Sequence, residues 1–254
     1  DPDAIGSALA LRELLGRNRP TTPIVTFGEI TRPENLAMIR LLEIQIDKIS
    51  YEDLHKDGAR VALVDVQPPY FQQSLGRVDL VVDHHPKRIA FKARFADLRS
   101  AYGATSTIFT EYLRAAGMEP SQRLATALVY GIKTDTLFLE RGSNLADLSA
   151  FNFLYPLANK AMIARIERPA LPREDLEAMG RALSRLQVDN GVAVIHLGEI
   201  NREDVIPQLA EFCLQIEGVD WSVVSGLVKD RVVISVRNVG YVKSAGEIMK
   251  RLYD

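Results

Sequence analysis

Two short, nearly continuous apolar segments constrain the fold of this chain most strongly: residues 61–66 and residues 78–82. Apolar runs of this length are typical of strands buried on both faces of a parallel sheet. Asp65 stands at the end of the first run, and Asp83 directly follows the second. Open α/β sheets bind their ligands at the carboxyl ends of the strands. The sequence therefore predicts a parallel sheet with acidic side chains along its ligand-binding edge.

Helical and extended patterns alternate through the first part of the chain. Apolar residues recur at helical spacing in some segments and form short runs in others. The pattern predicts helices at residues 4–16, 33–42, 105–116 and 121–132, and further strands at 23–27 and 44–49. This alternation predicts an α/β fold with a doubly wound, mostly parallel sheet.

The character of the sequence changes after about residue 158. Residues 161–190 are charged and mostly helical, and a second α/β pattern follows them. It begins with a strand at 192–197 and a helix whose apolar face is Leu209, Phe212, Cys213 and Ile216. Two strands at 221–228 and 232–236 follow, joined by a turn at Lys229-Asp230. A capping box at Ser244-Ala245-Gly246-Glu247 then opens a last helix. We predict a first domain at 1–158, a helical linker at 159–190 and a smaller α/β domain at 191–254, across a cleft.

Composition limits the function classes. The chain has 254 residues, 47% of them hydrophobic, which is enough for a buried core. The net charge of −2 argues against a binder of long nucleic acid but allows a short nucleotide in a local pocket. The single cysteine, Cys213, excludes an internal disulfide and favours a reducing, cytoplasmic location. No apolar stretch approaches the roughly 20 residues of a membrane span.

Acidic residues at the ends of two predicted helices are candidates for function. Asp1 and Asp3 precede the first helix, where capping of the helix is the simpler interpretation. Asp135 lies near the carboxyl end of a helix, where the helix dipole disfavours a negative charge. A nearby cation, either Lys133 or a metal ion, would offset this penalty.

The triplet Asp83-His84-His85 is the strongest functional signal. The chain has only four histidines, and two of them are adjacent at the end of a predicted strand, whereas His55 and His196 have no partner motif and are interpreted as structural. The motifs together supply the candidate metal ligands Asp1, Asp3, Asp65, His84 and Asp135. Carboxylate and imidazole ligands suit manganese and related divalent ions. There are enough carboxylates to hold two ions about 3.5–4 Å apart.

In this order, the four motifs resemble those of the DHH phosphoesterases. They are Asp-x-Asp-Ala-x-Gly-Ser, a strand-end Asp, Asp-His-His and Gly-Ile-x-Thr-Asp-Thr, and the segment Gly103-Ala104-Thr105-Ser106 also fits the family pattern. The resemblance covers residues 1 to about 140. More loosely, the second half resembles the DHHA1 domain, in which Arg237 matches a substrate-contacting arginine. The resemblance thus implies a DHH catalytic domain followed by a DHHA1-like substrate-binding domain.

The resemblance also implies a role for each candidate. Asp1 would ligate a first ion, together with a histidine that the family carries a few residues before this motif. Asp3, His84 and Asp135 would ligate the second ion, and Asp65 would bridge both ions. Asp83 would orient a histidine ring, and His85 would act on the substrate phosphate. Ser106 and Arg237 would bind substrate. The family's Gly-Gly-Gly-His substrate segment would follow the last helix, beyond Asp254, so we expect both ends of a longer protein to lie outside this chain.

The function implied by the resemblance is that of a divalent-metal-dependent phosphoesterase. It would hydrolyse phosphodiester or phosphomonoester bonds of short oligonucleotides or nucleotide bisphosphates with a hydroxide activated by two ions, Mn²⁺ or Mg²⁺. One alternative is a pyrophosphatase or exopolyphosphatase of the same family, although basic residues are spread thinly over the second domain. Another is a metal-free regulatory module that retains the fold. The exact substrate and the oligomeric state are left open, with a homodimer as one option.

Overall fold

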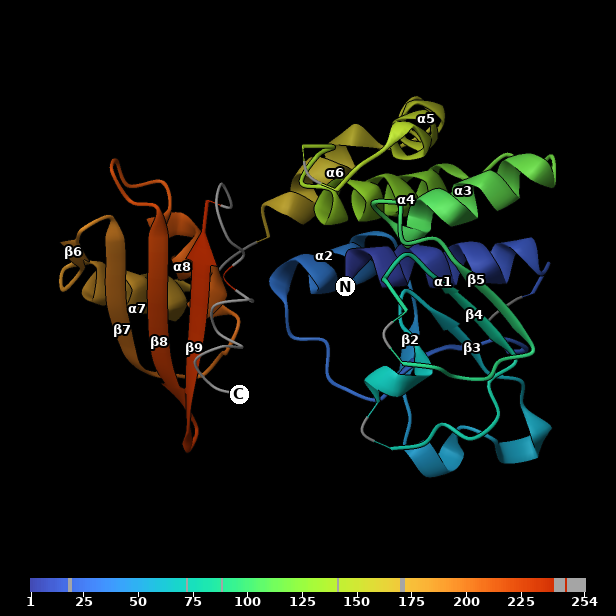
Figure 1. Cartoon of the computed structure of the whole chain (residues 1–254), viewed down its shortest axis with the longest axis horizontal. Coiled ribbons are helices and arrows are strands. Elements are labelled where there is room, and N and C mark those ends of the chain that lie inside the picture. The colour runs from blue at the N-terminus through green and yellow to red at the C-terminus, as the bar shows by residue number, and fades with distance from the viewer. Residues whose placement is uncertain are drawn as a thin grey trace. The chain divides into compact units, whose positions relative to one another are not determined.

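The computed structural model describes residues 1–239 except 18, 19, 72, 88, 141, 170 and 171, and it also describes residue 245. The chain divides into two compact units, Asp1–Pro169 and Ala170–Asp254. The first unit combines parallel strands with helices, and the second is built on one mixed sheet (Figure 1). This arrangement confirms the predicted α/β class with parallel sheets and a separate, smaller sheet domain.

Parallel strands form the sheets of the first unit. Strands β3 (Ala62–Val64), β4 (Leu80–Asp83) and β5 (Phe95–Leu98) pair in that order, and β1 (Ile24–Thr26) pairs with β2 (Ile46–Lys48). Strand β5 was not predicted, because Asp97 interrupts its apolar residues. All of these pairs are parallel, so the carboxyl ends of β3 and β4 lie at the same edge of their sheet.

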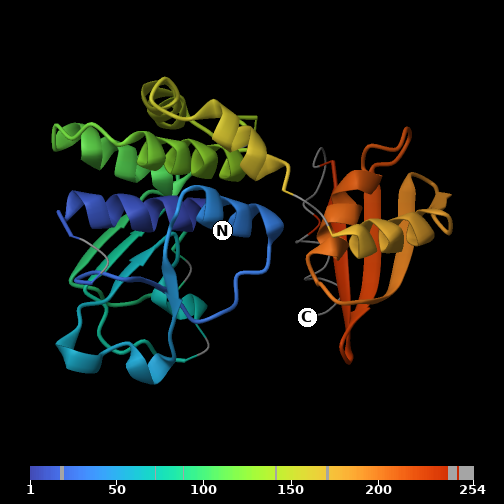
Figure 2. The same cartoon turned by 180° about the vertical axis from the view of Figure 1, so that it is seen from behind.

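The helices of the first unit lie on one side of the sheet β3-β4-β5 (Figures 1 and 2). They are α1 (Pro2–Leu14), α2 (Pro33–Leu41), α3 (Thr105–Ala115), α4 (Gln122–Asp135), α5 (Leu145–Leu154) and α6 (Lys160–Glu167). Val82 packs in the core beneath these helices, whereas its neighbour Val81 packs in a second core on the opposite face. Short 3-10 helices at Tyr51–Asp53, Lys56–Gly58 and Pro68–Tyr70 lie on that second side.

Two glycines allow α1 and α4 to approach each other closely. A Cβ atom at Gly6 would lie 3.1 Å from the Ala127 carbonyl oxygen. A Cβ atom at Gly131 would lie 2.5 Å from Ser106 Oγ and 3.0 Å from Asp3 Cα. The close contact brings the amino end of α1 against the carboxyl half of α4, where Asp3 and Asp135 are located.

We expect Gly131→Ala to lower the free energy of unfolding by about 1–3 kcal/mol, because the added methyl group overpacks a site bounded by Asp3 and by the buried Ser106 side chain. Urea denaturation followed by circular dichroism measures the change. The control is Gly180→Ala in the middle of helix α7 (Arg173–Leu183), where no atom lies within 4 Å of the added Cβ. This control should be neutral or stabilising by up to about 1 kcal/mol. Equal effects of the two substitutions would contradict the close-contact explanation.

The second unit contains a four-stranded sheet with helices α7 and α8 (Val205–Cys213) packed on its strands. The strands are β6 (Gln187–Asp189), β7 (Val192–Ile200), β8 (Trp221–Val228) and β9 (Arg231–Asn238), in the order β6-β7-β8-β9. Only the central pair, β7 and β8, is parallel among these neighbours. The predicted capping box at 244–247 lies outside the described residues, apart from residue 245.

The segment 159–190, predicted as a linker, is shared between the two units. Ile163 and Ile166 of α6 pack in the core of the first unit. Ala182 of α7 packs in the core of the second unit. The change from one unit to the other falls between Pro169 and Ala170, within the predicted segment. None of the helices in the described ranges is both long enough and apolar enough to cross a lipid bilayer.

Candidate metal centre

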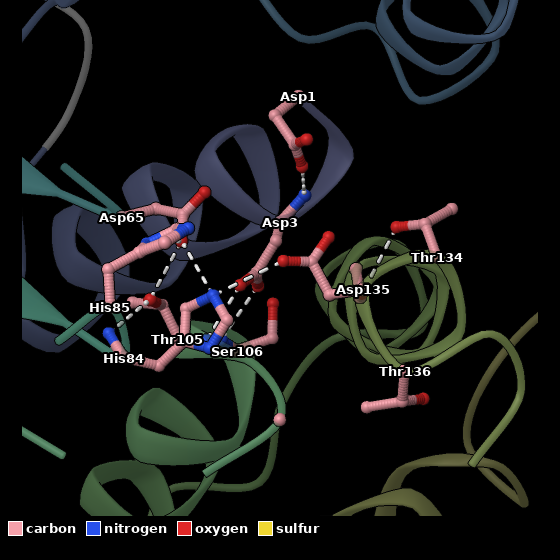
Figure 3. A network of polar contacts seen from close by, with 12 residues as sticks. Asp1, Asp3, Asp65, His84, His85, Thr105, Ser106, Thr134, Asp135 and Thr136 are labelled. Carbon is pink, nitrogen blue, oxygen red and sulfur yellow. Dashed lines mark hydrogen bonds and ion pairs between the residues drawn. The ribbon is translucent and has the colours of Figure 1, made fainter. Parts of the chain in front are cut away.

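Four side chains from separate segments converge at the edge of the sheet β3-β4-β5 where β3 and β4 end (Figure 3). Asp65 directly follows β3, and His84 directly follows β4. Asp3 belongs to the first turn of α1, and Asp135 is the last residue of α4. One potential ligand atom from each of these residues lies within 4.8 Å of all the others.

The ring of His84 faces the carboxylates of this cluster. Its Nε2 atom lies 3.3 Å from Asp135 Oδ2 and 3.5 Å from Asp65 Oδ1. Nε2 is buried and makes no hydrogen bond. A buried nitrogen that faces two carboxylates without a hydrogen-bond partner fits a divalent cation, because imidazole and carboxylates are its usual ligands. A second group, which overlaps the first, consists of Asp65, His84 and His85.

The opposite ring nitrogen of His84 is held by the backbone. Nδ1 donates to the Tyr102 carbonyl oxygen at 3.1 Å, which leaves Nε2 as the atom directed at the cluster. Burial acts to lower the pKa of His84, but the carboxylates of Asp135 and Asp3 outweigh burial and raise the pKa to about 9. Without a metal ion, His84 is therefore a cation at neutral pH. A metal ion would replace its Nε2 proton.

Asp3 is fully buried and bound by the amino end of α3. The Thr105 N–H donates to Asp3 Oδ2 at 2.6 Å, and the Ser106 N–H donates to Oδ1 at 2.7 Å. These amides lie at the positive end of the helix dipole and stabilise a carboxylate. Burial and the charge of Asp135 nevertheless raise the pKa of Asp3 to about 6. Asp3 is thus a buried carboxyl group that lies close to a second carboxylate, Asp135, and to the cationic ring of His84.

Asp65 is held in a backbone conformation that is uncommon for residues other than glycine. Its φ angle is 62°, in the left-handed region, and its N–H donates to the Val82 carbonyl oxygen at 2.9 Å. Asp65 Oδ1 accepts a hydrogen bond from Thr105 Oγ1 at 3.0 Å. Burial, followed by the charges of Asp3 and Asp135, raises the pKa of Asp65 well above its ordinary value. Backbone strain and electrostatic strain therefore meet at one residue, which is common at functional sites.

The turn after α4 positions Asp135. The Thr136 hydroxyl donates to the Ile132 carbonyl at 2.6 Å and accepts the Leu139 N–H at 2.9 Å. The next three residues, 137–139, all have left-handed φ angles of 46°, 60° and 69°. The chain thus turns sharply away directly after Asp135. Lys133, one of the two cations considered for Asp135, forms an ion pair with Glu167 of α6.

His85 lies beside the cluster and is oriented by Asp83. His85 Nδ1 donates to Asp83 Oδ1 at 2.8 Å, and Gln67 Nε2 donates to Asp83 Oδ2 at 2.7 Å. Burial acts to raise the pKa of Asp83, but these hydrogen bonds outweigh it and lower the pKa below its ordinary value. Asp83 is fully buried, whereas 55% of the His85 side chain is exposed. His85 can therefore present Nε2 to a substrate while Asp83 holds Nδ1.

Besides Asp83 and His85, three other predicted site residues lie outside this cluster. Asp1 caps α1, with Oδ1 accepting the Asp3 N–H at 2.9 Å, and it stands apart in Figure 3. Ser106 was predicted to bind substrate, but it is fully buried in this structure. Its N–H donates to Asp3 Oδ1. Arg237 belongs to β9 of the second unit, where Nε lies 3.8 Å from Glu211 Oε2.

Gln67 and Thr105 contact the site but were not predicted from the sequence. Gln67 follows Asp65 by two residues, and Thr105 belongs to the Gly103–Ser106 segment that matched the family pattern. Neither side chain is a typical metal ligand, so ligand spacing alone could not have found them. Their positions close to the strand-end aspartate and at the start of a helix were the only available signals.

No family model matches this chain. An uncharacterized protein of Methanocaldococcus jannaschii is 34% identical over 256 residues, which cover all of this chain and 53% of that protein. An exopolyphosphatase-related protein from Bacteroides fragilis has a similar structure, with a TM-score of 0.66 and 19% identity over 94% of this chain and 76% of the other. The chain shares the fold of this exopolyphosphatase-related protein. The shared fold agrees with the resemblance seen in the motifs.

A second structure supports the same fold. A Methanococcus jannaschii protein proposed to be a family II inorganic pyrophosphatase matches with a TM-score of 0.56 and 19% identity, over all of this chain and 88% of the other. Identities at this level establish a shared fold and leave the reaction to be argued from the site. The chain spans about half of the length of the curated M. jannaschii relative.

Proposed function

We propose that this chain is the DHH-type part of a divalent-metal-dependent phosphoesterase that acts on short oligonucleotides or nucleotide bisphosphates. The convergence of Asp3, Asp65, His84 and Asp135 within 4.8 Å is the observation that carries the proposal. Three carboxyl groups and an imidazole that lie this close together and largely away from water destabilise a fold that holds no metal ion. Their arrangement fits a hydrolase that uses metal ions to act on phosphoric esters.

The proposed ligand assignments follow the cluster. Asp3, His84 and Asp135 would hold one ion, and Asp65 would reach both that ion and a second one. Asp1 would ligate the other ion, the one not held by Asp3, and would first have to release the hydrogen bond that it accepts from the Asp3 N–H. When bound, two Mn²⁺ or Mg²⁺ ions would supply an activated water molecule and neutralise charge on the phosphoryl oxygens.

His85 would handle the proton of the leaving group. Its Nδ1 is held by Asp83, and its half-exposed ring leaves Nε2 free to donate a proton or a hydrogen bond to a phosphate ester oxygen. Asp83 keeps this ring oriented through its hydrogen bond with Nδ1. Arg237 would bind a second phosphate group, because guanidinium pairs with phosphate in a bidentate manner.

A second candidate is a pyrophosphatase or exopolyphosphatase of the same fold. Two similar structures carry such names, exopolyphosphatase-related and family II inorganic pyrophosphatase, which is the reason to test these substrates. The described part of the second unit offers few basic residues for a long polyphosphate, among them Lys229, Arg231 and Arg237. We therefore favour the nucleotide substrate. Cys213, buried and without a disulfide, accords with the cytoplasmic location that we propose.

The function is tested with a substrate panel. The chain is incubated with Mn²⁺ or Mg²⁺ and with two- to five-nucleotide RNA, phosphoadenosine phosphate, cyclic dinucleotides, pyrophosphate or polyphosphate. Release of mononucleotide or phosphate from the nucleotide substrates, abolished by a chelator, is the expected result. Turnover of pyrophosphate or polyphosphate alone would select the second candidate. Failure to bind either metal ion would favour the metal-free regulatory module.

His85→Asn is expected to lower kcat by about 10²–10⁴-fold, because a general acid would be lost from the reaction. Mn²⁺ affinity should change only a few-fold, since His85 lies outside the cluster of four ligands. Steady-state kinetics and calorimetric titration of Mn²⁺ measure the two effects separately. The control is His196→Asn in β7 of the second unit, which should leave both unchanged. A loss of Mn²⁺ affinity as large as that of His84→Ala would instead make His85 a metal ligand.

A further inference from the structure

We propose that Thr105 is a positioning residue that holds three of the candidate metal ligands in one geometry. The inference rests on the proposed metal site and deepens it. Thr105 is the first residue of α3 and is fully buried. It has no ionisable group, so its part in the site must be exerted through the ligands that it contacts.

Thr105 contacts three ligand residues from three separate segments. Its N–H donates to Asp3 Oδ2 at 2.6 Å, and its hydroxyl donates to Asp65 Oδ1 at 3.0 Å. The same hydroxyl accepts the His84 N–H at 3.2 Å. These partners are 102, 40 and 21 residues away along the chain. One residue therefore connects the start of α1, the loop after β3 and the end of β4 (Figure 3).

The direction of the hydroxyl proton follows from these contacts. A threonine hydroxyl has one proton to donate and lone pairs that accept. Because the His84 N–H donates to this oxygen, the hydroxyl proton is available for Asp65 Oδ1, which lies 3.0 Å away. The bond orients the carboxylate of Asp65, whose left-handed backbone is itself a strained conformation. Thr105 thus links the orientation of Asp65 to the position of His84.

Thr105 is itself held in place from α5. Asp147 is fully buried and accepts the Gly103 N–H at 2.9 Å and the Thr107 hydroxyl at 2.6 Å. A Cβ atom at Gly103 would lie 2.5 Å from Thr136 Cγ2, so the turn before α3 is closely packed. Thr105 therefore stands on a rigid turn, as a residue that positions metal ligands requires.

The test compares Thr105→Val, Thr105→Ser and the control Thr126→Val. Valine keeps the shape and the N–H that binds Asp3 but removes the hydroxyl, whereas serine retains the hydroxyl. Thr126 is a matched control in α4: it is fully buried, donates to the Gln122 carbonyl at 2.6 Å and accepts the Asn159 N–H at 2.9 Å. Each variant of the whole chain is titrated with Mn²⁺ by calorimetry, and circular dichroism establishes that it is folded.

We expect Thr105→Val to weaken Mn²⁺ binding about 10- to 100-fold, as is usual when a group that orients metal ligands is removed. Thr105→Ser should restore most of the affinity, and Thr126→Val should bind Mn²⁺ like the wild type even where its melting temperature falls. The inference would be overturned, and the proposed function left intact, if folded Thr105→Val bound Mn²⁺ with wild-type affinity. Equal losses of Mn²⁺ affinity in Thr105→Val and Thr126→Val would have the same consequence. A wild-type chain that binds no divalent cation would overturn the proposed function, and the inference with it.

Discussion

Asp65→Asn is expected to abolish metal-dependent hydrolysis and, at the same time, to stabilise the metal-free protein. Asparagine has nearly the shape of aspartate but no negative charge to share between two ions. The loss of several kcal/mol of transition-state stabilisation corresponds to a fall in kcat/KM of about 10³-fold or more. Kinetics with Mn²⁺ and the best substrate of the panel measure this loss.

The stabilising half of this prediction follows from the charges around Asp65. Burial and the carboxylates of Asp3 and Asp135 raise the pKa of Asp65, so its ionised form is disfavoured in the folded protein. A neutral side chain removes this repulsion, and the melting temperature measured with a chelator at pH 8 should rise. The control is Asp189→Asn on exposed β6, which should change neither activity nor melting temperature. A drop in stability together with full activity would remove Asp65 from the site.

The sequence predicted those parts of the site that stand at the ends of regular elements. Asp65 and Asp83 follow apolar runs that became β3 and β4, and parallel pairing necessarily brings such strand ends to one edge. Asp1 and Asp3 were open to two interpretations, as helix caps or as ligands. In the structure the interpretations divide: Asp1 caps α1, and Asp3 joins the cluster.

Other features depend on contacts that sequence periodicity does not record. Gln67 and Thr105 act as hydrogen-bond donors, and such donors occur throughout loops and helix starts without a distinctive spacing. Strand β5 was missed because its register with β4 comes from the neighbouring strand and not from an apolar run of its own. The charged, mostly helical segment after residue 158, which is interrupted at Pro169 to Pro172, was interpreted as a connector, yet α6 and α7 pack in different cores. Tertiary packing decided these points.

The metal-free protein is expected to lose stability as the pH rises from about 5 to 9. The pKa values of Asp3 (about 6), Asp65 and His84 (about 9) all lie above their ordinary values. The folded state therefore holds more protons than the unfolded state. Each contribution is fully present below the ordinary pKa and is lost as the pH rises through the folded pKa. For Asp3 alone, a shift of about two units corresponds to stability on the order of 3 kcal/mol.

Divalent cations should reverse this pH dependence. An ion bound by the four residues replaces the protons that the site otherwise holds, so its binding becomes more favourable as the pH rises. Mn²⁺ at about 100 times its dissociation constant would stabilise the folded protein by about 2.7 kcal/mol. The resulting increase in melting temperature should be larger at pH 8 than at pH 6. In His84→Ala the increase should be small at both values. A metal-free melting temperature that rises steadily from pH 5 to pH 9, or an Mn²⁺ effect that is largest at low pH, would contradict the charge arrangement on which the metal centre rests.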